Sequence, residues 1–436
     1  MERRNHAKVA FCTLGCKTNQ YDTQSMKEQF LNRGYDVVDF DSWADVYVIN
    51  TCTVTNLADR KSRQAITKAN KNNPEATVAV VGCYTQRAAT EVLALPGVDI
   101  VAGTGDRAKI ADLVQKHDKS HTINAVSDIM NQTRFEEVPI KGHHEKTRAV
   151  LKIQDGCNQF CAYCIIPYVR GQVRSRNSDE ILKEAKNLAV SGYKEIVLTG
   201  IHIASYGEDL HDTNLLKLLD RMHSVEGIER LRLGSVDPQL LTGQFIKIAS
   251  ELPKLCPHYH LSLQSGSDRI LKLMNRSYTT DQFAKIVRDL RSNIPDVAVT
   301  TDVMVGFPGE TDEDFESTLN FVNDIQFSRI HVFRYSDRQN TLAAGFTGKI
   351  KQSLKEERSK RLIKLGEQLE IRYMQTFLGK EVSILVEDKS AQHENCVEGH
   401  TGNYVKVVIN SAVDLLGKVV TVVPDRIDNG YLVAYL

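Results

Sequence analysis

Strand-like and helix-like segments alternate along most of this 436-residue chain, and this alternation limits the possible folds more than any other feature. Near the N-terminus, short apolar runs predict strands, and the amphipathic stretches between them predict helices. Such alternation is typical of a parallel sheet covered by helices, so we expect an α/β domain over residues 1–140. The expected strands are residues 8–14, 45–50, 77–81 and 98–101, and the expected helices are residues 19–33, 56–73, 87–93 and 106–117.

Six more strand–helix units follow a polar stretch at residues 118–145, which we interpret as a linker. Six parallel units are typical of an open, partial barrel that carries its chemistry at the carboxyl ends of its strands. We therefore expect a partial (β/α)6 barrel over residues 141–376, ending in a charged amphipathic helix at about 352–377. The expected strands are residues 149–154, 195–198, 230–235, 259–264, 297–305 and 329–335.

The last segment, residues 377–436, contains five short strand candidates. Five strands in so short a segment predict a small β-barrel of the oligonucleotide-binding type. The fold class is therefore α/β with a small all-β barrel at the C-terminus. The candidates are residues 381–386, 395–399, 404–409, 418–423 and 430–435.

The cellular compartment follows from the hydropathy pattern. The N-terminal apolar run is too short for a signal peptide, and no segment is long enough to span a membrane. We therefore expect a cytoplasmic protein without a membrane partner. In that compartment the nine cysteines favour metal or catalytic roles over a disulfide framework.

Three of these cysteines lie close together, where the first expected barrel strand ends. The loop from Asp155 to Cys164 has the sequence D-G-C-N-Q-F-C-A-Y-C, which contains Cys157, Cys161 and Cys164. Three thiolates at this spacing can bind a [4Fe–4S] cluster and leave one iron without a protein ligand. The amino and carboxylate groups of S-adenosylmethionine can chelate such an iron. An electron from the cluster then yields a 5′-deoxyadenosyl radical, while the protein positions the cofactor.

Other metal sites suit this loop less well. A zinc site needs a fourth Cys or His at ligand spacing, and the sequence has none nearby. A bacterial ferredoxin motif has four cysteines at a different spacing. The loop therefore predicts a radical S-adenosylmethionine enzyme.

The loop and several motifs around it resemble the methylthiotransferase family of radical S-adenosylmethionine enzymes, and the resemblance covers essentially the whole chain. Family enzymes use two molecules of S-adenosylmethionine. One methylates a sulfur held at a second cluster, and the other supplies the radical that opens a C–H bond for that sulfur. The motifs are I-I-P-Y-V-R-G-Q-V-R-S-R at 165–176, L-G-C-K-T-N at 14–19, N-T-C-T at 50–53 and G-C-Y-T-Q at 82–86.

The resemblance implies that Cys16, Cys52 and Cys83 bind the second, auxiliary [4Fe–4S] cluster. The residues alone leave two interpretations open. Each cysteine follows a predicted strand, and the carboxyl ends of parallel strands share one edge, where ligand sites form. Free cysteine is also among the most buried residue types, so three structural cysteines fit the same positions. Cys12, Cys256 and Cys396 match no family ligand, and we interpret them as structural.

Family members act on two kinds of substrate, a modified adenosine next to the tRNA anticodon or an aspartate of a ribosomal protein. The K-T-N at 17–19 and the L-S-L-Q at 261–264 resemble the enzymes that act on threonylcarbamoyladenosine at tRNA position 37. The resemblance implies a 2-methylthio product, and isopentenyladenosine tRNA or the ribosomal aspartate is the alternative substrate. A catalytically idle iron–sulfur RNA-binding protein is disfavoured, because pure binding needs no open iron.

The resemblance also suggests further binding residues. Tyr163 matches an aromatic residue that lies against the adenine of S-adenosylmethionine, and Gly200 ends the strand that holds its methionine amino group. Polar residues end the third, fourth and fifth barrel strands and are candidates for ribose or methionine binding, although strand ends are often polar in any protein. These residues are Ser235, Gln264 and Asp302.

Charge points to RNA only in part, because Lys plus Arg and Asp plus Glu each total 55. Residues 141–176 carry seven Lys or Arg against two Asp or Glu, whereas residues 378–436 carry five against eight. We interpret Arg170, Arg174 and Arg176 as contacts for RNA phosphates or for a substrate carboxylate. The C-terminal barrel resembles the RNA-binding TRAM barrel of tRNA methylthiotransferases, so specific contacts must replace bulk attraction. We expect tRNA as partner and a flavodoxin- or ferredoxin-type reductant.

Overall fold

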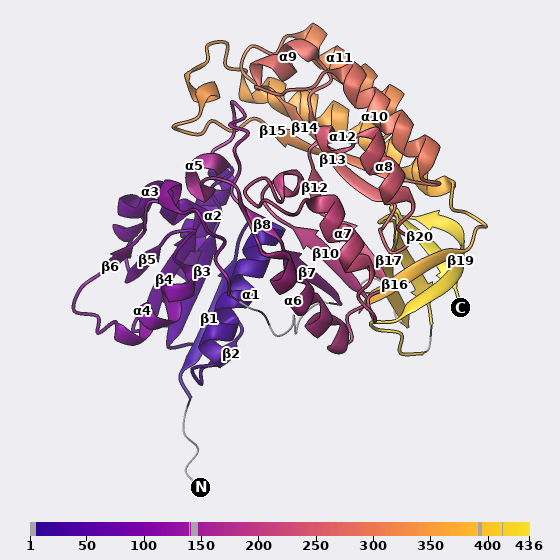
Figure 1. Cartoon of the computed structure of the whole chain (residues 1–436). Coiled ribbons are helices and arrows are strands. Elements are labelled where there is room, and N and C mark those ends of the chain that lie inside the picture. Colours follow the sequence, from indigo (N-terminus) through magenta and orange to yellow (C-terminus); the bar gives the residue numbers. More distant parts are fainter. Residues whose placement is uncertain (1–5, 139, 141–146, 391–394, 412) are drawn as a thin grey trace.

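The computed structural model describes residues 6–138, 140, 147–390, 395–411 and 413–436. An N-terminal parallel sheet, a central partial barrel and a small C-terminal barrel lie in chain order across the molecule (Figure 1). The predicted combination of parallel α/β structure with a small C-terminal β-barrel is confirmed.

The N-terminal sheet has six parallel strands in the order β2-β1-β3-β4-β5-β6. The two edge strands, β2 (Asp36–Val38) and β6 (Ile123–Ala125), were not predicted, because three residues carry too little periodicity to stand out. β6 and a short 3-10 turn, η2 (Ile129–Asn131), lie within the expected linker. The other elements are β1 (Lys8–Thr13), α1 (Lys17–Leu31), β3 (Val46–Thr51), α2 (Asn56–Asn72), β4 (Thr77–Gly82), α3 (Cys83–Leu93), β5 (Ile100–Ala102), η1 (Arg107–Lys109) and α4 (Ile110–Lys116).

Alternation along β3 explains why this sheet is covered on both faces. Tyr47 and Ile49 belong to one buried cluster, and Val46 and Val48 belong to the cluster on the opposite face. Successive side chains of a strand point to opposite faces, so a continuous apolar run places hydrophobic groups against both helix layers.

The central domain contains the six predicted parallel strands, with the third divided into two pieces at Gly234. The division separates a sheet of order β11-β10-β7 from a sheet of order β12-β13-β14-β15. The strands are β7 (Arg148–Lys152), β10 (Glu195–Thr199), β11 (Arg230–Leu233), β12 (Ser235–Val236), β13 (His258–Gln264), β14 (Ala298–Val305) and β15 (Arg329–Arg334). The helices are α5 (Ile166–Arg170), α6 (Ser178–Val190), α7 (Leu215–His223), α8 (Gly243–Ser250), α9 (Asp268–Leu273), α10 (Thr280–Asn293), α11 (Asp312–Ile325) and α12 (Gln352–Gln375), with the 3-10 turns η3 (Ile203–Ser205), η4 (Pro238–Leu240) and η5 (Leu342–Gly345).

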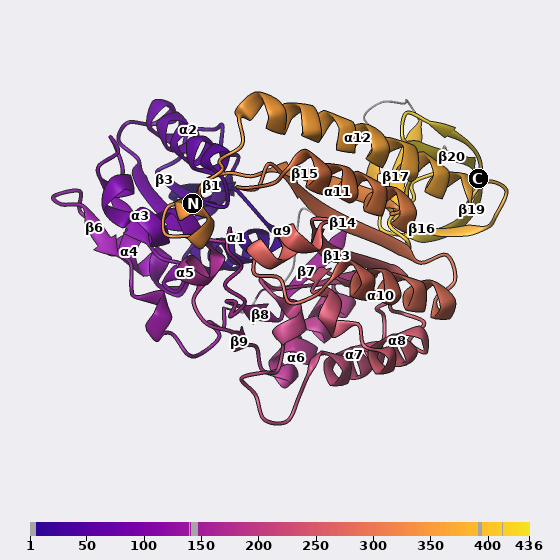
Figure 2. The ribbon, with the colours of Figure 1, turned by 90° about the horizontal axis from the view of Figure 1, so that it is seen from above.

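The five predicted C-terminal strands close into a barrel of order β16-β17-β18-β20-β19. Helix α12 leads from the central domain to this barrel and lies along β15 on the way (Figure 2). Met374 and Phe377, at the end of α12 and just after it, pack into the barrel core with Ile384 and Val407. The strands are β16 (Val382–Lys389), β17 (Cys396–Thr401), β18 (Lys406–Asn410), β19 (Val419–Asp428) and β20 (Tyr431–Tyr435).

The small barrel closes the amino end of the central strands. Arg232 donates hydrogen bonds to the carbonyls of Thr401 and Gly402 at 3.3 and 2.8 Å. Its guanidinium lies 4.8 Å from the ring centre of Tyr404, and Arg148 lies 5.1 Å from the same ring. Tyr404 therefore stands beneath the central barrel, at the end opposite to the cysteine loop.

Candidate functional site

The loop of Cys157 begins at a tight backbone contact. β8 (Gln154–Asp155) pairs with β9 (Arg174–Ser175) in antiparallel fashion, and Gly156 follows with φ of 77°. A Cβ on Gly156 would lie 1.8 Å from the carbonyl oxygen of Gln172, so only glycine fits. The amide of Cys157 then donates to the carbonyl of Gly171 at 3.0 Å. These backbone contacts thus fix the position of Cys157 at the start of the cysteine loop.

The three thiols of this loop are half-buried and receive hydrogen bonds from nearby donors. The amide of Gln159 lies 3.5 Å from Cys157 Sγ, and Arg276 Nη1 lies 3.2 Å from Cys161 Sγ. Burial raises the pKa of Cys157 to about 11 and that of Cys164 to about 12, and the neighbouring Cys161 adds to both increases. A positively charged group that accepts thiolates would relieve this cost, as an iron–sulfur cluster does.

Cys16, Cys52 and Cys83 meet at one edge of the N-terminal sheet, as predicted. Cys16 is the N-cap of α1 after β1, Cys52 directly follows β3, and Cys83 opens α3 after β4. These three strands are neighbours in the sheet. A Cβ on Gly15 would lie 2.9 Å from Cys52 Cβ, so the Cys16 loop packs directly on Cys52.

The three thiols are close enough for their charges to affect one another. Burial raises the pKa of Cys52 to about 12, and Cys83 and Cys16 add to the increase. Within the described part of the chain, no three Cys, His, Asp or Glu side chains converge closely enough to bind a single metal ion.

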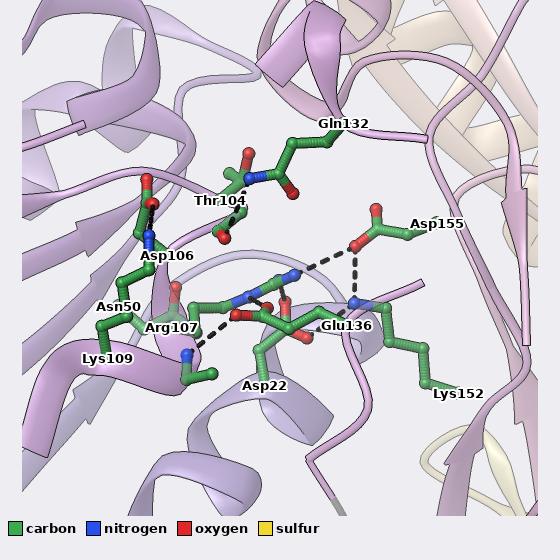
Figure 3. Close-up of polar contacts among 12 residues, drawn as sticks. Asp22, Asn50, Thr104, Asp106, Arg107, Lys109, Gln132, Glu136, Lys152 and Asp155 are labelled. Atoms are coloured by element: carbon green, nitrogen blue, oxygen red, sulfur yellow. Dashed lines mark hydrogen bonds and ion pairs between the residues drawn. The ribbon is translucent and has the colours of Figure 1, made fainter. Parts of the chain in front are cut away.

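A buried charge network connects Cys83 with Asp155, which lies just before the Cys157 loop. Arg170 Nε lies 3.4 Å from Cys83 Sγ, and its Nη1 lies 3.0 Å from Asp22 and 3.1 Å from Asp155, two residues before Cys157. Lys152 Nζ bridges the same two carboxylates at 2.8 and 2.6 Å, and Arg107 contacts both as well (Figure 3). Three cations thus surround two fully buried carboxylates, and they hold the pKa of Asp155 well below its usual range against the opposing effect of burial.

The expected RNA-phosphate contacts of the arginines are wrong. Arg170, Arg174 and Arg176 are all almost completely buried. Arg176 pairs with Glu137 and Glu184 at 2.9 and 2.8 Å, and Arg174 donates to the carbonyls of Gln172 and Arg170. The charge count over residues 141–176 was misleading, because the compensating Asp22, Glu137 and Glu184 lie outside that stretch.

The other predicted residues are placed as follows. Tyr163 packs against the cluster of Phe307, Tyr335 and Ala343. Gly200 directly follows β10, and the space beside it already holds the Gln154 side chain, since a Cβ there would lie 2.8 Å from Gln154 Oε1.

The three polar candidates differ in position. Ser235 is exposed at the start of β12, and Gln264 ends β13 with φ of 68°. The expectation that Asp302 ends its strand is wrong, because β14 continues to Val305. Asp302 lies instead inside the strand, where its carboxylate pairs with His260 Nε2 at 3.3 Å.

The cysteines expected to be structural lie outside both thiol sets. Cys12 packs in a core cluster of the N-terminal sheet, and Cys396 packs against Val408 and Tyr431 in the small barrel. Cys256 is buried beside Arg232.

No motif in the sequence marked Arg276, Arg338 or Tyr404 as functional residues. Lys17 was noted only as part of the K-T-N motif. Arg338 Nη2 donates hydrogen bonds to Thr53 and Asp59 at 2.6 and 2.7 Å. Thr53 directly follows Cys52, so Arg338 links the central domain to the sheet edge that carries Cys16, Cys52 and Cys83. Isolated arginines outside any motif give no local signal. Lys17 did offer one, because it adjoins Cys16 within a recognised motif.

Two family models match the chain. Residues 151–322 match the Radical SAM superfamily, and residues 8–103 match a family described as Uncharacterized protein family UPF0004. The chain is 45% identical over 420 residues to the Threonylcarbamoyladenosine tRNA methylthiotransferase MtaB of Bacillus subtilis (strain 168), covering 95% of this chain and 93% of that protein. It is 36% identical over 417 residues to the tRNA-2-methylthio-N(6)-dimethylallyladenosine synthase of Moorella thermoacetica, covering 94% of each.

Among solved structures, the radical S-adenosylmethionine methyltransferase TsrM of Kitasatospora setae shares the fold. The TM-score is 0.55 at 13% identity, over 75% of this chain and 73% of that one. At such low identity the likeness concerns the fold alone.

These matches at high coverage show that the chain belongs to the tRNA methylthiotransferase family of radical S-adenosylmethionine enzymes. The resemblance drawn from the cysteine motifs is confirmed. The protein is thus a transferase that uses S-adenosylmethionine with a [4Fe–4S] cluster and acts on tRNA. None of the helices in the described ranges is long and apolar enough to cross a membrane.

Proposed function

We propose that this enzyme converts threonylcarbamoyladenosine at tRNA position 37 to its 2-methylthio derivative. The proposal is supported by the 45% identity to the Bacillus subtilis protein of that name and by 40% identity to a protein of the same name from Aquifex aeolicus (strain VF5). The observation that carries the reaction type is the pair of three-thiol sets, with Arg170 connecting Cys83 to Asp155 just before the Cys157 loop. A methylthio transfer needs one place that holds sulfur and another that generates a radical, and the two must be adjacent.

We assign Cys157, Cys161 and Cys164 to a radical-generating [4Fe–4S] cluster, and Cys16, Cys52 and Cys83 to an auxiliary [4Fe–4S] cluster. When bound, these clusters supply the electron that cleaves S-adenosylmethionine and the sulfur that is methylated and transferred. The chain itself contributes hydrogen bonds from Gln159, Arg276 and Arg170 to the thiolate sulfurs, which are geometrically in place. Hydrogen bonds to sulfur and burial are the means by which proteins tune such clusters.

The three parts of the chain divide the work. We assign residues 1–140 to the auxiliary cluster, 141–376 to S-adenosylmethionine and the radical, and 377–436 to RNA binding as a TRAM barrel. Around the cluster of Cys157, Cys161 and Cys164, our candidates for binding S-adenosylmethionine remain Tyr163, Gly200, Ser235 and Gln264. The electron comes from a flavodoxin- or ferredoxin-type donor, and the enzyme works in the cytoplasm, where its tRNA substrate is found.

The alternative substrates are isopentenyladenosine tRNA and a ribosomal-protein aspartate. Relatives at 36% and 37% identity carry the dimethylallyladenosine name, so the first alternative has support of its own. The two tRNA substrates differ by a carboxylate, which threonylcarbamoyl carries and isopentenyl lacks. A direct comparison of the two RNAs therefore decides between them.

Reconstituted enzyme should methylthiolate an anticodon stem-loop with threonylcarbamoyladenosine and reject the same stem-loop with isopentenyladenosine. A site that binds a polar group discriminates against an analogue lacking it by up to about 10⁴-fold in kcat/KM. Nucleoside mass spectrometry measures both products. Preferential reaction with the isopentenyl RNA would overturn the proposed substrate. Analysis of tRNA nucleosides from cells lacking the gene provides the matching test in vivo.

Gly156→Ala should remove the iron of the Cys157 set. An added Cβ meets the Gln172 carbonyl at 1.8 Å, and a residue with φ of 77° adds about 1–2 kcal/mol of backbone strain. Iron analysis after anaerobic reconstitution should show about half of the wild-type content. Gly192→Ala is the matched control, because its φ is 93° but nothing lies within 4 Å. Equal iron in both variants would show that the loop geometry does not govern cluster binding.

A further inference from the structure

A chamber of about 320 Å³ lies at the junction of the three parts of the chain. Its wall combines α1, the edge strand β7, strand β10 and the small C-terminal barrel. Helix α1 lies against β7 (Figure 1). It is lined by Lys17, Gln20, Thr147, Arg148, Val150, Val197, Glu387, Asp388 and Tyr404.

Lys17 is the cation of this chamber that lacks a fixed partner. It makes no hydrogen bond or ion pair with any described residue, although it lines the cavity. Arg148, by contrast, is held by Glu387 at 3.0 Å, and Glu387 also contacts His400 at 2.9 Å. A lysine that faces a cavity and is not itself paired with a carboxylate can pair with an anion brought by a ligand.

The other cations around Lys17, Arg148 and Arg232, are already paired with the carboxylates of Glu387 and Glu195. Apart from burial, which lowers it, the groups with the largest effect on the pKa of Lys17 are Tyr404, Arg148, Arg232 and Glu195. Arg232 binds Glu195 at 2.6 Å, so this carboxylate is already engaged. Although burial opposes it, the nearby cations lower the pKa of Tyr404. The second carboxylate of the lining, Asp388, is exposed and is not among the neighbours that act most on Lys17.

The position of Lys17 ties the chamber to the reaction. Lys17 is the first residue of α1, directly after Cys16. The proposed function places the adenine C2 against the sulfur held at the cluster of Cys16, Cys52 and Cys83, and Lys17 directly follows one of these three cysteines in the chain. The N6 substituent lies on the same ring as C2. In threonylcarbamoyladenosine that substituent ends in a free carboxylate.

We propose that Lys17 determines substrate specificity by binding the carboxylate of the threonylcarbamoyl group in this chamber. The inference rests on the proposed function. The isopentenyl group is uncharged, so it could not form this ion pair with Lys17. Lys17 is exposed within the chamber, and a hydrogen bond between charged groups adds up to about 10- to 100-fold to affinity.

The test uses two anticodon stem-loops, one with threonylcarbamoyladenosine and one with the methyl ester of its threonine. Holoenzyme should bind the acid about 10- to 100-fold more tightly than the ester, measured as Kd by fluorescence anisotropy. Lys17→Gln should bind both alike, and Lys17→Glu should prefer the ester. Lys285→Gln, an exposed lysine paired only with Asp289 on α10, is the control and should keep the wild-type ratio.

The ratio of the two Kd values is taken on one preparation, so any loss of iron at the neighbouring Cys16 cancels. An unchanged acid-to-ester ratio in Lys17→Gln would overturn the inference. Equal weakening of both RNAs would also overturn it, because it would assign Lys17 to a phosphate. If wild-type enzyme forms no methylthio product on the acid stem-loop, the proposed function fails instead, and the two failures are distinguishable.

Discussion

Cys52→Ala should reduce bound iron from about eight to about four per chain and abolish methylthiolation of tRNA. Two thiolates hold a [4Fe–4S] cluster poorly, and Cys52 lies between Cys16 and Cys83 at the sheet edge. The loop of Cys157 is untouched by this change. The variant should therefore still cleave S-adenosylmethionine to 5′-deoxyadenosine, which chromatography quantifies beside the modified nucleoside.

The reciprocal variant, Cys161→Ala, should form neither 5′-deoxyadenosine nor methylthio product. It removes one thiolate of the radical set and leaves the auxiliary set complete. Iron should again fall to about four per chain, so iron content alone does not tell the two variants apart, and the 5′-deoxyadenosine assay does.

Cys12→Ala is the matched control, because Cys12 lies in β1, the strand that leads to Cys16, but packs in the core. It should keep about eight irons and full activity. If Cys52→Ala makes methylthiolated tRNA at the wild-type rate, Cys52 is structural and the two-cluster assignment is wrong.

Arg170→Met should destabilise the folded protein by about 3–5 kcal/mol, because it leaves Asp22 and Asp155 buried with too few cations. The same change removes the hydrogen bond to Cys83 Sγ. Urea denaturation followed by circular dichroism measures the loss of stability. The absorption spectrum of the reconstituted protein reports on the auxiliary cluster.

Two further variants separate charge from geometry at this position. Arg170→Lys keeps the charge but cannot contact Asp22, Asp155 and Cys83 together, so it should recover only part of the stability. The double variant Arg170→Met with Asp22→Asn should also be more stable than Arg170→Met, because it removes the unpaired carboxylate. Arg426→Met, at an exposed pair with Asp425, should leave stability unchanged. Wild-type stability in Arg170→Met would show that Arg107 and Lys152 suffice for the network.

The sequence was sufficient where the signal is local. Apolar runs and amphipathic periods predicted all the main strands, because burial on both faces of a parallel sheet requires continuous apolar residues. The Cys157 site could be predicted because its three cysteines lie close together in the sequence. Even Cys16, Cys52 and Cys83 were placed correctly, since parallel strands bring their carboxyl ends to one edge.

What the sequence by itself determined is therefore the order of elements, the two cysteine sets and the enzyme family. Only the tertiary structure decided which charges are used internally and which face a ligand. Arg170 and Arg176 looked like a basic surface but are neutralised by Asp22 of the N-terminal domain, by Asp155 just before the cysteine loop and by Glu184 of α6. Lys17 looked like one motif residue among several, yet it faces the chamber without a hydrogen bond or ion pair to any residue that the structure describes. Charge pairing depends on contacts between residues far apart in the chain, and local spacing does not encode them.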